Sequence, residues 1–512
     1  HESVRRCCFA VGTNHTTRVD RTNQFPTDLD GAKGRLGKPI EHASTIRSAS
    51  ASTHSFSTRS LNEMLDQRPA VRHWLSIVGI CGVCAVLPVI LVLTTINRHP
   101  KFSPIDEAAH FDYVERVYTH GIPDFGDRLL RSTLRELSCR GTRLDGMVVP
   151  PCNGKKPFNL YPGGAYQYEA QQPPLYYLVT APLAFLARHL FRVGKVSSAR
   201  AVGTIWLVAA LFLAWRVSRM LNVPRLPMFG MMLAIATSPM VIYYSSIVSN
   251  DAAGLFFGAL AAFLGVSAVR TRSFSPWWAF VSALGAALTK TSCALPFGVV
   301  GVILIGLCWS SVGRSLDVDR RQQIVERSRK TGLYMLLGAV VGSAVWISYY
   351  RAMATLDPKK LPTFDILRTG SVTPWTILGQ ARSFFSILTD TYTPFAAWNT
   401  DAYALIGSMT AFVVIASLGS AAFTKQRAWW TTTGSVLLVS LYLGGVVIGT
   451  GIWFSYDVNP GVSARYALPM LPLVGLVVPA GIQRRSGQMV FVGGCVLFAG
   501  LSMWMMIRTS LA

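Results

Sequence analysis

The stretch 103–113 places an adjacent pair of acidic residues, Asp106 and Glu107, close to His110 just beyond an apolar run. A carboxylate such as Asp106 or Glu107 can act as a general base that takes a proton from a hydroxyl group. His110 lies about one helical turn beyond Asp106 and can orient a carboxylate or bind a metal ion. The same residues also fit an ordinary helix start, with Ser103 as the N-cap and the acids in the first turn. Both interpretations stay open on the residues alone.

A second polar segment, 168–177, reads Tyr-Glu-Ala-Gln-Gln-Pro-Pro-Leu-Tyr-Tyr. Its two adjacent prolines end any preceding helix and open a new one. Gln171, Gln172 and Tyr176 suit the hydroxyl groups of a sugar, and aromatic residues such as Tyr176 equally suit a membrane interface. Residue chemistry does not decide between these uses.

Further polar residues lie at the ends of apolar runs. Asn250 and Asp251 fit a helix cap at a turn. Lys290 and Arg465 fit anchors whose charged ends reach the lipid headgroups. Ionisable residues gathered at one membrane face indicate a functional site.

Long apolar runs separate these polar segments. The chain has 512 residues, 51% of them hydrophobic and 14% charged, and a mean hydropathy of +0.37. A soluble domain carries about 25% charged residues. About eleven runs have the length that crosses a bilayer as helix. Their expected limits are 73–96, 203–221, 228–247, 252–269, 276–289, 294–311, 332–350, 403–424, 429–452, 466–482 and 488–507. The sequence therefore predicts an all-α polytopic membrane protein.

The basic residues predict the topology, because cytoplasmic loops carry more Lys and Arg than outer loops do. All basic clusters face the cytoplasm only if the segment 174–190 does not cross the membrane fully. The loops 97–202 and 351–402 then lie outside, the second containing an expected interfacial helix over 374–390. The formal charge of +23 reflects this topology and contact with membrane lipids. No RNA- or DNA-binding motif accompanies it, so nucleic acid is not an expected partner.

Residues 1–66 are rich in Ser, Thr, Arg and Asn and are expected to form a disordered cytoplasmic tail. Because the chain begins with His1, Met64 is a candidate start, and the membrane domain is expected over 67–512. Cys139 and Cys152 lie in the same polar loop. If that loop is extracytoplasmic, a disulfide between them is expected.

In combination these motifs resemble the polyprenyl-phosphate-sugar-dependent glycosyltransferases of the GT-C superfamily. The acidic pair with its histidine follows the first span, and the Gln-Pro-Pro-Leu-Tyr-Tyr run ends the same loop. Three further matches follow in order, namely Ser249-Asn250-Asp251-Ala252, Leu288-Thr289-Lys290 and Ala464-Arg465-Tyr466-Ala467-Leu468-Pro469. The chain is similar to a group of uncharacterised actinobacterial membrane proteins of that superfamily over roughly residues 73–510.

The resemblance implies a GT-C-like helix bundle with extracytoplasmic loops and juxtamembrane helices. It implies an inverting transfer of a sugar from a polyprenyl-phosphate donor to a cell-envelope acceptor at the outer face. Asp106 matches the position of the base, with Glu107 as its neighbour and alternate. Lys290 and Arg465 would hold the donor phosphate. The substrate-binding residues would be His110, Gln171, Gln172, Tyr176, Asn250, Asp251 and Tyr466.

Some relatives use a divalent cation and others do not, so a requirement for Mg²⁺ or Mn²⁺ stays undecided. The residues available to hold such an ion are Asp106, Glu107, His110 and Asp251. The expected location is the plasma membrane of a bacterium, with the N-terminus in the cytoplasm and the active site outside. Arabinose or mannose is the expected sugar, and the acceptor would be an envelope glycan, glycolipid or glycoprotein.

Two other classes of function stay open. One is a transporter or flippase of a lipid-linked or polar substrate, and the other is a non-catalytic scaffold for envelope assembly. Transporters often have internal repeats and helices interrupted near the bilayer centre, and the sequence has no repeat of that kind. It also has no P-loop for ATP. The enzyme is therefore the favoured interpretation.

Overall fold

The computed structural model describes residues 78–104, 106–143, 148–270, 275–306, 317–357, 372–389, 400–423, 428–456 and 461–508. Within these ranges the protein is all-α, with 16 α-helices and no β-sheet. The predicted all-α class is therefore confirmed. The expected tail 1–66 and two parts of the expected loop 351–402 lie outside the described residues.

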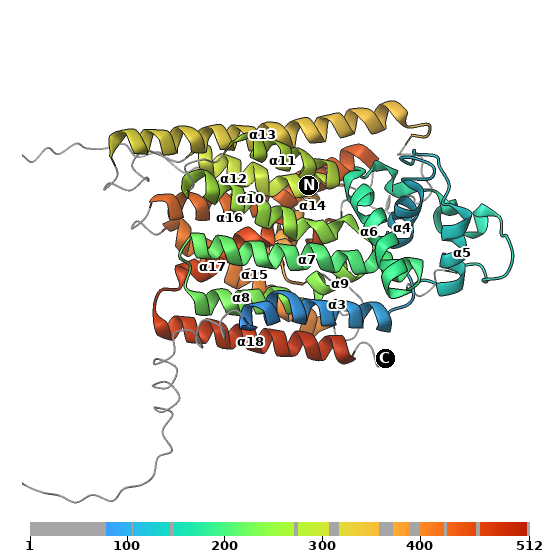
Figure 1. The fold of residues 1–512 in the computed structure, drawn as a ribbon, viewed down its shortest axis with the longest axis horizontal. Coiled ribbons are helices and arrows are strands. Elements are labelled where there is room, and N and C mark those ends of the chain that lie inside the picture. Colours follow the sequence, from blue (N-terminus) through green and yellow to red (C-terminus); the bar gives the residue numbers. More distant parts are fainter. Residues whose placement is uncertain are drawn as a thin grey trace, which may run out of the picture. The chain divides into compact units, whose positions relative to one another are not determined.

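Eight helices among the described residues are long and apolar enough to cross a membrane, so the chain is a multi-pass membrane protein. These spans are Val78–Arg98, which ends in α3 (Leu87–Arg98); α7 (Lys195–Met220); Asn250–Arg270, which contains α10 (Gly254–Arg270); α13 (Val318–Met353); Ala404–Ala422 in α15 (Thr400–Phe423); Thr431–Ser455 in α16 (Ala428–Tyr456); Ala464–Gly481, which ends in α17 (Leu471–Gly481); and α18 (Arg485–Arg508). Figure 1 shows these helices running side by side.

A ninth crossing results if α8 (Arg225–Thr237) and α9 (Pro239–Ser246) count as one bent span. The two helices meet at an angle of 50°. Pro239 has no backbone N–H to continue the hydrogen bonding of α8, and the Ser238 side chain instead caps α9 by accepting from Val241 N. The bend therefore follows from the Ser-Pro sequence.

Among the described residues eight or nine helices qualify as spans, against about eleven expected, because the helices described at 276–289 and 294–311 are short. Residues 307–311 of the second expected span lie outside the described residues. α11 (Trp277–Thr289) has 13 residues, and the helix Thr291–Ile305 that follows it ends in α12 (Leu295–Ile305). Thirteen helical residues reach about 20 Å, against a hydrocarbon core of about 30 Å. Lys290 separates the two helices with an extended backbone (φ −164°, ψ 136°).

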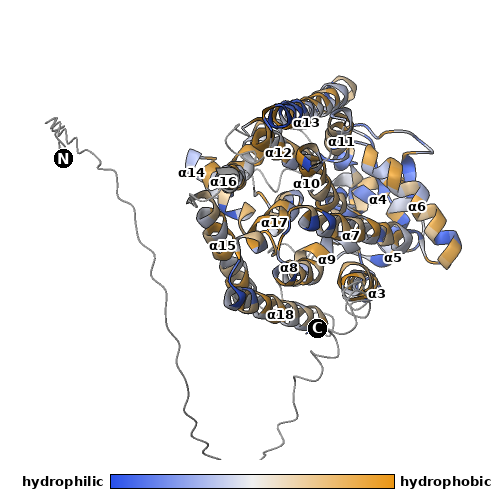
Figure 2. Cartoon of the chain, turned by 60° about the vertical axis from the view of Figure 1, so that its left-hand side comes forward, coloured by the Kyte–Doolittle hydropathy of each residue, from blue (hydrophilic) through white to orange (hydrophobic). Residues whose placement is uncertain are grey.

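The segment 174–190, expected not to cross fully, forms α6 (Leu175–Phe191). Its 17 residues place it among the shorter apolar helices rather than the candidate spans. The large side chains of Phe185, Leu190 and Phe191 are exposed on it. Figure 2 shows hydrophobic stretches along this helix. An exposed apolar face of this kind suits contact with lipid.

The first polar loop folds into α4 (Glu107–Arg116) and α5 (Arg131–Arg140), which lie with α6 at one end of the bundle (Figure 1). Arg116 bonds Asp112 at 2.9 Å, Asp127 at 2.7 Å and the Arg128 carbonyl oxygen at 2.6 Å, and so ties α4 to the chain that follows it. A disulfide joins Cys139 at the end of α5 to Cys152, the pairing expected from the sequence.

In the second polar loop the expected helix over 374–390 is shorter than predicted. It consists of α14 (Pro374–Gly379) and a 3₁₀ helix over Gln380–Phe384. Thr373 caps α14 through a reciprocal capping box with Thr376. Trp375 at its start is 80% exposed, whereas Phe384 is buried.

Two glycines allow α10 to approach the segment that carries Arg465. A Cβ atom at Gly258 would overlap the carbonyl oxygen of Pro469, and a Cβ at Gly254 would crowd the Pro469 ring. The close approach brings the 3₁₀ helix Ala464–Met470 against the N-terminal end of the span that begins at Asn250. Asp251 and Arg465 therefore lie close to each other.

Candidate functional site

Asp106 occupies the N-cap position of α4 but does not cap the helix with its side chain. Its backbone is in the left-handed region (φ 58°, ψ −1°), which asparagine and aspartate adopt more readily than most residues. Its carbonyl oxygen accepts from His110 N at 3.0 Å, and its carboxylate makes no capping bond. The helix therefore begins at Glu107, later than the expected start after Ser103. The carboxylate of Asp106 is left to interact elsewhere.

Arg465 is the partner of Asp106. Its Nη2 lies 3.0 Å from Asp106 Oδ2, and its Nε lies 3.8 Å from Asp251 Oδ2. Ser463 caps the helix that carries Arg465 by accepting from Arg465 N at 3.3 Å. Lys290 forms an ion pair with the other oxygen of Asp251. Two carboxylates and two cations thus alternate in one cluster.

The cluster draws together the ends of several elements. Asp106 comes from the start of α4, Asp251 from the start of its span, Lys290 from the break between α11 and α12, and Arg465 from the start of the span that ends in α17. Asp251 and Lys290 are buried, while the side chain of Asp106 keeps 27% of its surface exposed. Asp106 is therefore the acid of the cluster most open to a ligand.

The amide residues predicted for the site lie beside the charges. Asn250 Nδ2 donates to Gln172 Oε1 at 2.9 Å and to the Thr289 carbonyl oxygen at 3.4 Å. The Gln171 carbonyl oxygen accepts from Trp346 Nε1 at 2.5 Å. These bonds join the 168–172 segment to α13 and to Asn250, and they join Asn250 to the residue just before Lys290.

Aromatic rings complete the surroundings. The Tyr466 ring centroid lies 4.9 Å from Lys290 Nζ and 5.3 Å from the Arg465 guanidinium carbon, distances at which a cation and a ring attract each other. Tyr176 is buried and packs edge-on against Tyr177, with ring centroids 5.3 Å apart. Tyr466 thus lies against the two cations of the cluster, and Tyr176 packs against Tyr177.

His110 is held between Tyr177 and an acid that the sequence analysis did not single out. Its Nδ1 lies 2.7 Å from the Tyr177 hydroxyl, and its Nε2 lies 3.8 Å from Glu169 Oε2. One ligand atom each from Asp106, His110 and Glu169 lies within 4.8 Å of the others. This is the set among the described residues that can hold a metal ion, and it contains Glu169 instead of the expected Glu107 and Asp251.

Burial sets the protonation of this group. It raises the pKa of Glu169 to about 8, and the neighbouring Asp106 carboxylate adds to the rise. Burial also lowers the pKa of His110 to about 3, against the opposing effect of Asp106. Burial raises the pKa of Tyr168 well above its ordinary value, and a hydrogen bond with Asp106 adds to this. Burial therefore favours the uncharged forms of both Glu169 and His110.

The structure does not bring Glu107 into the cluster. Arg200 donates two hydrogen bonds of 2.6 and 2.7 Å to the Glu107 carboxylate. The backbone N–H groups of Val248 and Ser103 donate to the same carboxylate at 3.0 and 2.7 Å. Glu107 is fully buried. A carboxylate with both oxygens engaged in this way joins α4 to α7 and the chain after α9, and it has no free face for a substrate proton.

Several buried atoms of the cluster have unused hydrogen-bonding capacity. Asn250 Oδ1, Glu169 Oε2 and Arg465 Nε are buried and have no hydrogen-bond partner among the described residues. Buried polar atoms are almost always partnered in folded proteins. The acceptor and donor atoms left over here are suited to a polar ligand.

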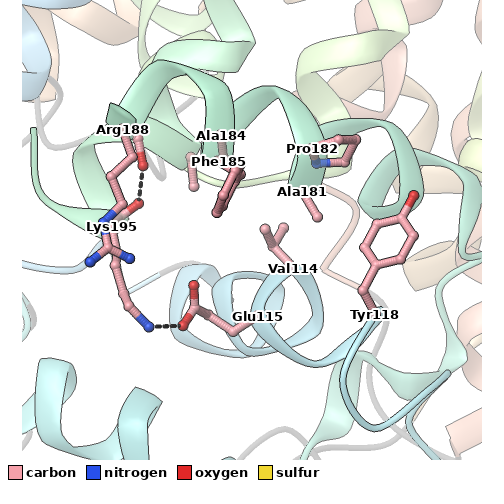
Figure 3. Close-up of a pocket in the computed structure, with 11 residues that line it drawn as sticks. Val114, Glu115, Tyr118, Ala181, Pro182, Ala184, Phe185, Arg188 and Lys195 are labelled. Carbon is pink, nitrogen blue, oxygen red and sulfur yellow. Dashed lines mark hydrogen bonds and ion pairs between the residues drawn. The ribbon is translucent and has the colours of Figure 1, made fainter. Parts of the chain in front are cut away.

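A cavity near the cluster is lined by none of the four charged residues of the cluster. It is a groove of about 410 Å³ between α4, α6 and α7 (Figure 3). Val114 and Ala181 line it, and each lies one helical turn beyond a residue of the bonded pair His110–Tyr177, Val114 after His110 and Ala181 after Tyr177. Arg188 and Lys195 lie at one side of the groove, where Lys195 pairs with Glu115 at 2.5 Å.

Fold and site together define a multi-pass α-helical membrane protein with a buried polar cluster at one end of its bundle. No protein-family model, curated protein or solved structure matches the chain. Function must therefore be inferred from the chemistry of the cluster.

Proposed function

We propose that the chain is an inverting glycosyltransferase with a GT-C-like bundle, which moves a sugar from a polyprenyl-phosphate donor to a cell-envelope acceptor. The observation that carries the proposal is the pairing of Asp106 with Arg465 beside Lys290. The pairing places a partly exposed carboxylate next to two cations, which are the groups that a reaction of a hydroxyl with a sugar phosphate requires.

Asp106 is the proposed base. It takes the proton of the acceptor hydroxyl while that oxygen forms a bond to the anomeric carbon of the sugar. The bond between that carbon and the donor phosphate oxygen breaks, and the electron pair leaves with the phosphate. Attack opposite to the leaving group inverts the anomeric centre, so one carboxylate is sufficient.

Arg465 and Lys290 receive the leaving phosphate. This group gains negative charge as the sugar bond breaks, and cations already fixed in place stabilise such charge without reorganisation. In the structure both cations are balanced by Asp106 and Asp251. A donor phosphate that binds Arg465 weakens its hold on Asp106 and thereby frees the base, so donor binding prepares the chain for the acceptor.

The surroundings of the cluster suit a donor that is a lipid. The apolar groove beside α6 begins one turn from His110 and Tyr177, and the exposed face of α6 adjoins it. A polyprenyl chain lying in this groove keeps its phosphate at the end of the bundle. This end is proposed to face the outside of a bacterial plasma membrane, where sugars arrive on lipid carriers.

The test is transfer in proteoliposomes, with wild type compared with Asp106→Asn. Each sample receives radiolabelled polyprenyl-phosphate arabinose or mannose and a crude envelope glycan as the acceptor. Glu326→Gln is the matched control, since it makes the same change at an exposed carboxylate on α13. Transfer by wild type and by the control that collapses in Asp106→Asn supports the proposal, and the active donor names the sugar.

The same vesicles separate the alternatives. Movement of the labelled donor across the bilayer without transfer to the glycan would identify a flippase or transporter. Neither transfer nor movement by well-folded protein would favour a scaffold. Both results would overturn the proposed enzyme.

A further inference from the structure

Glu169 has a buried oxygen atom with no hydrogen-bond partner in the part of the chain that the structure describes. The side chain is 6% exposed, and Oε2 has no hydrogen-bond partner while it points at His110 Nε2 from 3.8 Å. A buried carboxylate oxygen left without a partner is unfavourable, because it has lost its hydrogen bonds to water and gained none from the protein. A bound metal ion removes that cost.

The backbone around Glu169 is fixed in position against α4. Glu169 N donates to Gln167 Oε1, and Gln167 Nε2 donates to the Ala109 carbonyl oxygen at 2.8 Å and to Asp112 Oδ2 at 2.9 Å. Gln167 therefore holds the 3₁₀ helix Tyr168–Gln171 over the helix that carries His110. The separation of the two side chains is set by these bonds.

His110 is oriented from its other nitrogen. The Nδ1 atom bonds the Tyr177 hydroxyl at 2.7 Å, and the imidazole ring stacks on the Tyr177 ring at 5.9 Å. Metal-binding histidines characteristically bond a second group through the nitrogen that does not bind the metal, which fixes the ring and its tautomer. With the hydrogen on Nδ1, the lone pair of Nε2 points toward Glu169.

We propose that Asp106, His110 and Glu169 form a binding site for one divalent transition-metal ion, with Tyr177 as the residue that orients His110. One nitrogen and two carboxylate ligands suit Mn²⁺ or Zn²⁺ better than Mg²⁺ or Ca²⁺, which prefer oxygen ligands alone. Ligand atoms within 4.8 Å of one another need only a small inward movement to reach a common ion.

The charges of the cluster allow the ion. Two cations, Arg465 and Lys290, face three acids, Asp106, Asp251 and Glu169, so the fully ionised cluster is negative by one charge. A divalent ion reverses this to positive by one, which favours a singly charged anion such as a phosphodiester. Metal binding by these residues is independent of any transfer reaction.

The test is metal binding by the purified full chain in detergent, stripped with a chelator and without any sugar donor. We expect one ion per chain when Mn²⁺ or Zn²⁺ is titrated by calorimetry, and no comparable binding of Mg²⁺. Glu169→Gln is expected to weaken the affinity by about 100-fold and Tyr177→Phe by about 10-fold, as losses around metal ligands do. Glu326→Gln is the control that leaves affinity unchanged.

A spectroscopic readout on wild type does not depend on whether a variant folds. Bound Mn²⁺ is expected to show coupling to a ¹⁴N nucleus by pulsed electron paramagnetic resonance, which only a nitrogen ligand such as His110 supplies. Binding without nitrogen coupling, wild-type affinity in Glu169→Gln, or no uptake of either ion by folded wild type would each overturn the proposal.

Discussion

The Nη2 atom of Arg465 lies 3.0 Å from Oδ2 of Asp106, although 359 residues separate the two in the chain. The pair joins the first polar loop to the start of the next-to-last described span. The Arg465 side chain is 13% exposed, so most of the pair is shielded from solvent. A pair in such a position is sensitive to the loss of either partner.

Replacing Asp106 by Asn is expected to abolish transfer without unfolding the chain. The amide keeps the size of the carboxylate but cannot accept the acceptor proton, and loss of a general base costs about 10²–10⁴-fold in rate. The measurement is kcat in proteoliposomes together with the apparent melting temperature in detergent. Full activity in a folded Asp106→Asn variant would assign the base to another group.

Replacing Arg465 by Lys tests the phosphate role separately. The positive charge is kept, but a lysine cannot hold Asp106 and a phosphate with a planar fork. We expect kcat to fall by about 10²-fold, the size of effect seen when one donor to a developing charge is lost. The control is Arg320→Lys, at an exposed position on α13. An unchanged kcat in Arg465→Lys would contradict the proposed role.

Glu107→Gln is expected to destabilise the protein rather than to affect the chemistry directly. Removing one partner of a buried ion pair costs about 3–5 kcal/mol, because Arg200 is left with an uncompensated charge. The double variant Glu107→Gln/Arg200→Met removes both charges and should recover part of the loss. Thermal unfolding in detergent measures both. A stable but inactive Glu107→Gln variant would instead return Glu107 to the list of catalytic candidates.

Ala181→Trp tests whether the groove beside α6 holds the lipid part of the donor. The indole fills space that Ala181 leaves open, so we expect KM for the lipid-linked donor to rise about 10-fold or more at nearly unchanged kcat, the pattern of lost uniform binding. Leu333→Trp, at an exposed position on α13, is the control. Equal KM values for the two variants would place the lipid chain elsewhere.

Much of the cluster could be predicted because each residue lies at a motif near the end of an apolar run. Asp106, Asp251, Lys290 and Arg465 were expected at one membrane face, and the structure brings them within reach of one another. Glu169 was missed, although it lies in the same segment as the predicted Gln171 and Gln172. Nothing in a local sequence shows that Gln167 turns this acid toward His110.

The pair Asp106-Glu107 shows why neighbouring acids could not be assigned from sequence. Successive residues of a helix point about 100° apart. The left-handed backbone at Asp106 separates the two side chains further, so that one meets Arg465 and the other meets Arg200. The number of spans depends on helix length instead. The sequence already places a break at Lys290, but among the described residues α11 and the helix Thr291–Ile305 are too short to count as candidate spans.

The two ends of α13 predict the orientation of the chain. Near its C-terminal end Trp346 bonds the Gln171 carbonyl oxygen, beside the cluster, while Arg327 near its N-terminal end bonds the Ala268 carbonyl oxygen at the far end of α10. The N-terminal part carries Arg320, Arg321, Arg327, Arg329 and Lys330, so the positive-inside rule places it in the cytoplasm. A cysteine introduced at Arg320 should react with a membrane-impermeant maleimide only after cells are permeabilised. The background chain keeps the Cys139–Cys152 disulfide and carries serine at its seven other cysteines, Cys7, Cys8, Cys81, Cys84, Cys293, Cys308 and Cys495. A cysteine at Asn153 in the disulfide-bonded loop is the control and should react in intact cells.

The reverse pattern would put the polar cluster on the cytoplasmic side, where a lipid-carried sugar is not needed, and would remove the reason for proposing a polyprenyl-phosphate donor.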